Sequence, residues 1–214
     1  MRTEELVAML ARGPVAADIH TTERCLGMAA AAGAGVAALS AFAILGVRPD
    51  LAWMLQHPAF WIKLAFPATL ALAAFAASCR MARPGARLGV TRVALVGPIV
   101  VVLVVAWLAL LSASPGERIA LVAGHTALEC VVSVGLLALP VFAAAFVALR
   151  RLAPTRPRAA GALAGLLGGG IAATVYAFHC DEMQAPFVAV WYSLGMSIPV
   201  LIGATLGPRL LRWA

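Results

Sequence analysis

The sequence has few charged residues. Asp, Glu, Lys and Arg make up 12% of its 214 residues, about half of the roughly 25% that is usual in soluble domains. Hydrophobic residues make up 63%, the mean hydropathy is +0.97, and the apolar residues come in long blocks. One soluble core cannot use so much apolar side-chain surface, so the composition excludes a soluble globular domain and predicts an integral membrane protein.

Cysteine is also scarce, and its spacing is informative. The four cysteines are Cys25, Cys79, Cys130 and Cys180, and no two of them form a Cys-x-x-Cys pair. That spacing is typical of zinc ribbons and of enzymes that exchange an intramolecular disulfide. Its absence argues against a redox enzyme of that kind, and we expect no catalytic residues.

Six apolar stretches are each close to the ~20 residues that an α-helix needs to cross ~30 Å of hydrocarbon. Turn-forming proline and glycine residues separate them. The expected fold is all-α, an integral membrane bundle of six transmembrane helices within residues 25–214, preceded by a polar segment, residues 1–24. The predicted helices are 25–45, 60–78, 93–111, 128–148, 159–177 and 187–206.

Small residues recur at every fourth position in two of these helices, and each row predicts a smooth face for close packing inside the bundle. The rows are Gly161, Gly165, Gly169 and Ala173 in the fifth helix, and Gly27, Ala31 and Gly35 in the first.

Basic residues favour one side of the predicted membrane. The outer loops hold only Arg48, Lys63 and Arg118. The other side holds Arg2, Arg12, Arg24, Arg80, Arg83, Arg87, Arg92, Arg150, Arg151, Arg156, Arg158, Arg209 and Arg212. The positive-inside rule therefore places the N-terminus and the C-terminus in the cytoplasm.

Cys130 and Cys180 are predicted to lie together at the outer mouth of the bundle. They stand about eighteen residues before and about twenty-one residues after the basic loop that joins the fourth and fifth helices, so they reach similar depth at ~1.5 Å per residue. This topology permits a disulfide, which needs Cα atoms within ~7 Å, but does not establish one. Cys25 and Cys79, at the inner ends of helices, are interpreted as packing thiols.

Two histidines accompany the outer cysteines. His179 directly precedes Cys180, and His125 shares a helical face with Glu129 if the fourth helix extends outward that far. Two thiolates with imidazole nearby suit soft or borderline ions such as copper, zinc or cadmium. The predicted metal ligands are therefore Cys130, Cys180, His179 and His125, for a transient ion rather than a required cofactor. On the residues alone, a packing role for the cysteines stays equally open.

The amino-terminal segment has the pattern of a short amphipathic helix. Thr3 is a suitable cap, and Glu4 and Glu5 follow in the first turn. The apolar side consists of Leu6, Val7, Met9 and Leu10. The polar side lacks the Lys and Arg residues that favour anionic lipid, so a groove on a protein partner is the expected dock.

Three stretches carry a resemblance to a known family. The opening TEELVAMLARGPV, the run from Leu149 to Cys180 with its APTRP and HC elements, and PFVAVWYSLG from Pro186 to Gly195 resemble the NrsF family of six-helix inner-membrane anti-sigma factors. The resemblance runs the whole length. It implies a multi-pass protein of a bacterial inner membrane that holds an extracytoplasmic-function sigma factor inactive and releases it on metal or oxidative stress. It implies no direct contact with nucleic acid, and it leaves the oligomeric state open.

The resemblance also implies roles for individual residues. A periplasm-facing cysteine pair that the family needs for its response maps onto Cys130 and Cys180. The sigma contact lies in residues 1–24 and maps onto Leu6, Val7, Leu10, Pro14 and Val15. The resulting hypothesis is that metal binding or oxidation at the cysteines changes the contact between the fourth and fifth helices and weakens the sigma contact. The acidic pair Asp181-Glu182 is a departure from the family pattern, which is variable at this point. It leaves the identity of the inducer open.

Two other classes remain as alternatives. A membrane thiol-disulfide oxidoreductase would also use outward cysteines, although the missing Cys-x-x-Cys argues against it. A small metal transporter should carry ligands near the bilayer midplane, and the middles of the predicted helices are nearly free of ionisable residues.

Overall fold

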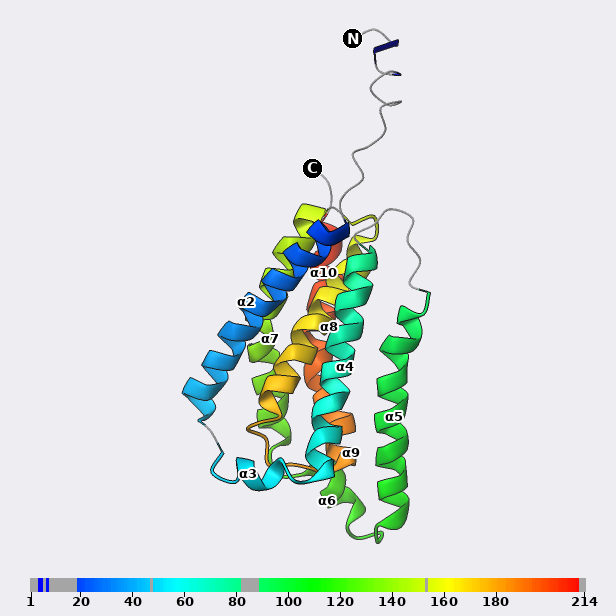
Figure 1. Cartoon of the computed structure of the whole chain (residues 1–214). Helices are drawn as coiled ribbons and strands as arrows, with labels where there is room; N and C mark the ends of the chain where they lie inside the picture. The colour runs from blue at the N-terminus through cyan, green and yellow to red at the C-terminus, as the bar shows by residue number, and fades with distance from the viewer. Residues whose placement is uncertain are drawn as a thin grey trace.

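The computed structural model describes residues 4, 5, 7, 19–46, 48–81, 89–152 and 154–211. This part of the chain is helical and contains no strand. Six helices are long and apolar enough to cross a membrane, and consecutive long helices run in opposite directions in one bundle (Figure 1). The all-α, six-helix prediction is confirmed to this extent.

The long helices begin and end within six residues of the predicted bounds, and the largest differences are at the starts of the first and last helices. They are α2 (Ile19–Leu45), α4 (Pro58–Met81), α5 (Thr91–Ser112), α7 (Ala127–Leu152), α8 (Pro157–Tyr176) and α10 (Ser193–Leu210). Three short helices and one π-helical turn lie at one end of the bundle (Figure 1); the helices were not predicted, and the turn falls inside the predicted helix 187–206. They are α3 (Leu51–Met54), α6 (Arg118–Ala123), α9 (Ala185–Phe187) and the π-helical turn η1 (Val188–Tyr192), which continues into α10.

Special backbone residues set several of these boundaries. Gly46 follows α2 with φ 75°, and Gly124 follows α6 with φ 55°, a left-handed conformation that glycine adopts without steric cost. Pro157 is the first residue of α8, where its missing N–H would have no helical partner in any case.

Helix α8 is the centre of the bundle, because it packs against α10, α7, α4 and α2. Its glycine row lies on α10: a Cβ added to Gly165 would stand 2.1 Å from the carbonyl oxygen of Pro199, and one on Gly161 would stand 2.1 Å from that of Gly203. Close packing of this row inside the bundle is therefore confirmed.

The row predicted for the first long helix was wrong. Ala31 and Gly35 are exposed, and nothing lies within 4 Å of a Cβ added to Gly35. The close approach to α7 occurs at Gly33 instead, where an added Cβ would stand 2.6 Å from the Cα of Val141.

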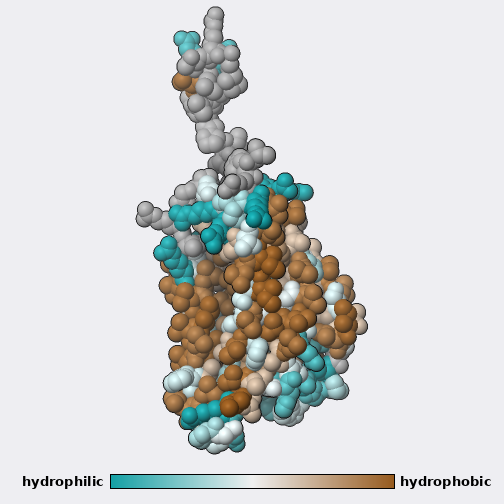
Figure 2. Space-filling view, turned by 180° about the vertical axis from the view of Figure 1, so that it is seen from behind, coloured by the Kyte–Doolittle hydropathy of each residue, from teal (hydrophilic) through white to brown (hydrophobic). Residues whose placement is uncertain are grey.

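The sides of the bundle are apolar and its ends are polar. Figure 2 shows a broad hydrophobic belt with hydrophilic residues at both ends. Helix α5 contributes strongly to exposed apolar surface, since only Thr91, Val102 and Ala106 of its residues are buried. Lipid hydrocarbon is the environment that tolerates such a belt.

The described arginine residues divide between the two ends as expected. The start of α2 and the end of α10 lie at one end, together with the α7–α8 link (Figure 1). Arg150 and Arg151 end α7 there, and Arg209 is in the last turn of α10. The opposite end, which carries α3, α6 and α9, is called the outer end below. Its assignment to the periplasm stays a prediction.

Candidate functional site

Cys130 and Cys180 lie in one buried cluster near the outer end. Cys130 is in the first turns of α7, and Cys180 follows the last turn of α8. Their exposed fractions are 0% and 3%, and both belong to the cluster that contains Tyr176 and Tyr192. Both thiols are free. The structure therefore brings the two predicted residues into one cluster, as reduced thiols in apolar surroundings.

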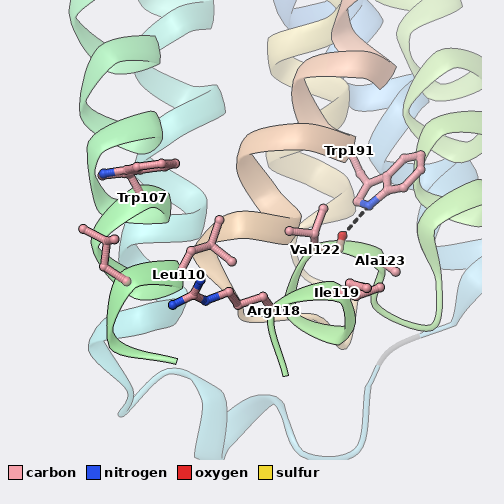
Figure 3. Close-up of a pocket in the computed structure, with 8 residues that line it drawn as sticks. Trp107, Leu110, Arg118, Ile119, Val122, Ala123 and Trp191 are labelled. Atoms are coloured by element: carbon pink, nitrogen blue, oxygen red, sulfur yellow. Dashed lines mark hydrogen bonds between the residues drawn. The ribbon is translucent and has the colours of Figure 1, made fainter. Parts of the chain in front are cut away.

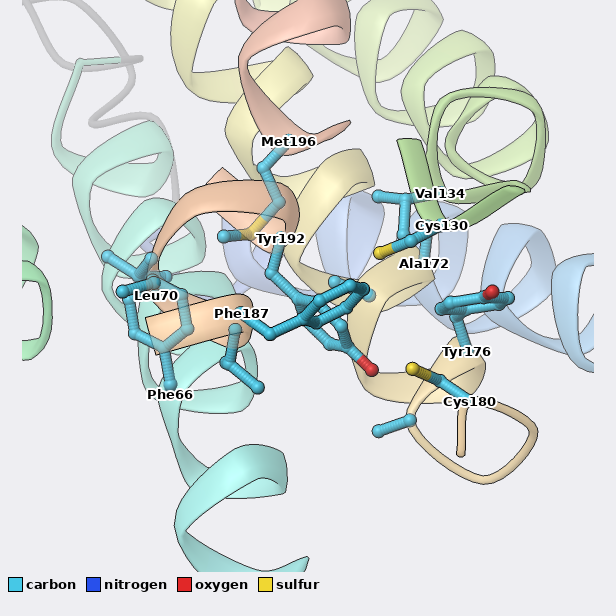
Figure 4. Close-up of a cluster of buried hydrophobic side chains, with 14 of the residues drawn as sticks. Phe66, Leu70, Cys130, Val134, Ala172, Tyr176, Cys180, Phe187, Tyr192 and Met196 are labelled. Atoms are coloured by element: carbon cyan, nitrogen blue, oxygen red, sulfur yellow. The ribbon is translucent and has the colours of Figure 1, made fainter. Parts of the chain in front are cut away.

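Figure 4 shows how the two thiols lie among the aromatic side chains. Tyr192 comes from η1, and its hydroxyl points toward the Cys180 sulfur. The Cys180 N–H donates to the Tyr176 carbonyl at 3.1 Å, and its Sγ lies 3.9 Å from the Glu182 carbonyl oxygen. Because its N–H donates back to the last residue of α8, Cys180 is held against the end of this helix.

Lys63 supplies a buried positive charge beside the thiols. Its side chain is 1% exposed, and its Nζ donates to the Cys180 carbonyl oxygen at 2.7 Å. The same atom lies 5.8 Å from the centroid of the Tyr192 ring. The ammonium group also interacts electrostatically with both cysteine side chains. Burial favours the neutral thiol, whereas positive charge close to a thiol favours its thiolate, the form that binds metals and reacts with oxidants.

The sequence interpretation had placed Lys63 with the outer loops, and that placement was wrong. Lys63 is in the second turn of α4 and faces the core. No carboxylate forms an ion pair with it among the residues that the structure describes. An unpaired lysine within an apolar span is energetically costly and usually functional, and this signal was already present in the sequence.

Arg48 links the Cys180 segment to α2. It forms ion pairs of 2.5 Å with Asp50 and with Asp181, which directly follows Cys180. The hydrogen bond from Arg48 lowers the pKa of Asp50, so this carboxylate stays ionised down to acidic pH. Because Arg48 is three residues beyond the end of α2, the contact joins the cysteine segment to the helix that follows the amino-terminal segment.

Glu182 links the same segment to the start of α7. Its Oε1 accepts a hydrogen bond of 2.6 Å from the His125 N–H. Gly124 makes this contact possible, since an added Cβ there would lie 2.7 Å from Glu182 Oε1 and 2.5 Å from the Phe187 ring. The segment 177–184 is thus fastened on both sides, to α2 and to α7.

The histidines do not complete a metal site. Helix α7 begins at Ala127, so His125 lies outside it and shares no helical face with Glu129, contrary to one predicted possibility. His179 packs its ring 5.3 Å from that of Phe42, and burial lowers its pKa, which keeps it neutral at pH 7. Within the described ranges no three His, Cys, Asp or Glu side chains gather closely enough to hold a metal ion. The four predicted ligands therefore do not converge.

What remains is a pair of thiols beside one cation. Two thiolates are the soft ligands that Cu(I) prefers, and the same two thiols are the reduced form of a disulfide. At the opposite end Cys79 is buried, and Cys25 packs against the same cluster, which agrees with a packing role for that pair.

The predicted sigma contact falls largely outside the described residues. Leu6, Leu10, Pro14 and Val15 are not described. Val7 has helical backbone and is 59% exposed.

Comparison with known proteins gives consistent matches over the whole chain. A family model named NrsF, "Negative regulator of sigma F", matches residues 10–213. The "Probable anti-sigma-F factor NrsF" of Azospira oryzae is 42% identical over 213 residues, and the "Anti-sigma-F factor NrsF" of Caulobacter vibrioides is 37% identical over 216 residues. Both alignments cover 100% of this chain and 100% of the relative. No solved structure matches.

Proposed function

The chain belongs to the NrsF family of negative regulators of a sigma factor, and on this premise we propose how it acts. It sequesters an extracytoplasmic-function sigma factor through residues 1–24 at the cytoplasmic face of a bacterial inner membrane. It releases the sigma factor when a metal ion binds to Cys130 and Cys180 or when an oxidant joins them. The outer end of the bundle faces the periplasm, and both termini face the cytoplasm.

One observation carries this proposal: two free thiols lie in one buried cluster, and the buried ammonium group of Lys63 donates to the Cys180 carbonyl oxygen. Capture of Cu(I) by two thiols releases two protons and leaves a bis-thiolate complex of charge −1. Lys63 balances that charge without a further ligand. Oxidation by a peroxide joins the two sulfurs, and the two electrons and two protons reduce the peroxide to water or to an alcohol and water. Either event draws Cys180 toward α7.

The route to the cytoplasm follows the contacts of segment 177–184. Movement of Cys180 displaces its neighbour Asp181, which pairs with Arg48, and displaces His179, which packs on Phe42 of α2. Helix α2 runs from the inner end of the bundle most of the way to the outer end (Figure 1). A shift of α2 at its outer end therefore changes the position of residues 1–24 at its other end.

The energy needed must come from the thiols. Moving the sequestered fraction from 99:1 to 1:99 requires ~5.5 kcal/mol of differential binding between the two states. The Arg48–Asp181 pair, in which Asp181 is 74% exposed, contributes only ~0–1 kcal/mol. Metal capture by thiolates is large enough, because structural zinc sites contribute ~10–16 kcal/mol.

The sequestration part is tested by co-purification of candidate sigma factors with the full chain. Wild type should retain its cognate sigma factor, and Leu6→Asp combined with Leu10→Asp should lose it. Glu4→Gln combined with Glu5→Gln is the matched control, because it alters the polar side of the same segment. Failure of the intact chain to retain any sigma factor would overturn the proposal.

A further inference from the structure

We propose that the outer groove between α5, α6 and η1 binds one anionic phospholipid. The groove is a cavity of about 460 Å³ in which apolar side chains from three elements meet, with one guanidinium group at its rim (Figure 3). Its lining consists of Trp107, Leu110, Leu111, Arg118, Ile119, Val122, Ala123 and Trp191.

The groove is built by a short helix that is held away from α5. Helix α6 has the sequence RIALVA, yet none of its residues is buried. Trp191 of η1 fixes its end, because the indole Nε1 donates to the Val122 carbonyl at 2.7 Å. Ile119 is consequently 79% exposed and Trp107 63% exposed across the gap. Two large apolar side chains face an opening that protein atoms leave unfilled.

Arg118, at the rim of the groove, is a cation that uses few of its N–H donors within the described part of the chain. Arg118 donates through Nε to the Ala113 carbonyl at 3.4 Å, which is a long and weak hydrogen bond. It forms no ion pair in the described part of the chain. The adjacent carboxylate is engaged elsewhere, since Glu117 accepts from the N–H and the hydroxyl of Ser114. A planar guanidinium with free N–H groups is suited to bind phosphate through two parallel hydrogen bonds.

The position of the groove identifies its occupant as a lipid. Trp107 and Leu111 belong to the outer part of a helix that is long and apolar enough to span the membrane. Tryptophan at the hydrocarbon boundary with arginine just beyond it is the usual arrangement at a lipid headgroup. An acyl chain fits along α5 against these side chains while its phosphate meets Arg118.

A lipid in this groove would touch the element that leads to the sensing thiol. Helix α6 joins α7 through Gly124 and His125, and Cys130 is in the first turns of α7. Occupancy would fix α6 against η1, the turn that carries Tyr192. The lipid composition of the outer leaflet thereby becomes an input to the thiol site.

Native mass spectrometry of the purified full chain in detergent tests the proposal by titration with phosphatidylglycerol and phosphatidylcholine. Wild type should bind one phosphatidylglycerol about tenfold more tightly than phosphatidylcholine. Arg118→Ala should abolish that tenfold preference, because it removes the charge-assisted hydrogen bonds to the phosphate. Ala123→Trp should weaken the binding of both lipids, because it fills the groove and keeps Arg118. Arg158→Ala, an exposed arginine at the other end, is the charge control and should behave as wild type.

Thermal unfolding of each variant separates loss of the site from loss of the fold, and only variants with wild-type unfolding temperatures are compared. Equal binding of the two lipids by wild type would overturn recognition of the anionic headgroup. Unchanged binding by Ala123→Trp would show non-specific surface lipid only and would overturn the groove.

Discussion

Replacement of Lys63 by methionine should separate sensing from stability. Methionine keeps most of the length of the side chain but removes the charge. Lys63 is 1% exposed and donates one hydrogen bond, to the Cys180 carbonyl oxygen. Loss of a hydrogen bond from a charged group costs ~1.5–3 kcal/mol, while removal of a buried, unpaired ammonium group recovers a desolvation penalty of several kcal/mol. The free energy of unfolding should therefore stay unchanged or rise.

Although Lys63→Met should not destabilise the fold, it should weaken metal binding at the thiol site. A bis-thiolate metal complex carries one negative charge, and Lys63 Nζ is separated from it by little more than the length of the Cys180 residue. At a separation of about 6 Å and an effective dielectric constant of about 20, two unit charges interact by about 3 kcal/mol. Removal of the ammonium group should weaken Cu(I) binding about a hundredfold.

The assay is Cu(I) competition against a chelator, with the purified full chain in reducing buffer. Lys63→Arg keeps the charge and is the matched control, and thermal unfolding is measured on all three proteins. Cu(I) affinity of Lys63→Met within twofold of wild type would refute the role assigned to the charge. Collapse of its thermal stability would refute the desolvation argument.

Three further predictions concern the fastening of segment 177–184 and the packing of the bundle. Asp181→Asn should change the free energy of unfolding by less than about 1 kcal/mol, because Asp181 is 74% exposed. The same substitution should raise the basal activity of a reporter gene that depends on the sigma factor. Burial lowers the pKa of His179, so its contribution to stability is complete above the unfolded-state value of about 6.5 and is lost as pH falls through the lower folded-state value. The unfolding temperature of wild type should thus fall between pH 7.5 and pH 5.5, and that of His179→Phe should fall less. Gly165→Leu should destabilise the protein by about 3 kcal/mol or more, because its Cβ would overlap the Pro199 carbonyl. Gly35→Ala has open space and should stabilise the protein by up to about 1 kcal/mol. Equal unfolding temperatures for these two glycine variants would contradict the packing of α8 on α10.

The six long helices were predictable because a helix long enough to cross hydrocarbon must be apolar along its length, whatever its neighbouring helices are. Helix α7 shows where the bounds differ: it continues past the predicted end at Ala148 through Arg150 and Arg151 to Leu152. Backbone groups near hydrocarbon must be hydrogen-bonded within the helix, and arginine side chains can reach from there to the polar boundary. Composition alone therefore underestimates helix length at the ends.

The details that depend on neighbouring elements were not predictable. Which glycine of α2 packs closely is decided by the face that meets α7, so Gly33 took the place of the predicted row. His125 lies outside α7 because Gly124 interrupts the helical path and Glu182 takes the His125 N–H. Elements of four to six residues such as α3 and α6 are too short to show a hydrophobic period.

The cysteine site could be predicted in part from the sequence. Equal depth followed from helix length, so the meeting of Cys130 and Cys180 in one cluster could be anticipated. The cation beside them could not be assigned from charge counting, because the positive-inside rule treats Lys63 as a boundary charge and ignores its partner. Only the fold shows that its ammonium group binds the Cys180 carbonyl.

The most direct measurement of the central claim is release of the sigma factor from the full chain in membrane vesicles. The complex is treated with Cu(I) or with peroxide, and the sigma factor that remains bound is quantified for wild type, Cys130→Ser, Cys180→Ser and Cys79→Ser. We expect release from wild type and from Cys79→Ser, and retention by both outer-cysteine variants. Release from Cys130→Ser and Cys180→Ser to the same extent as from wild type would contradict the central claim.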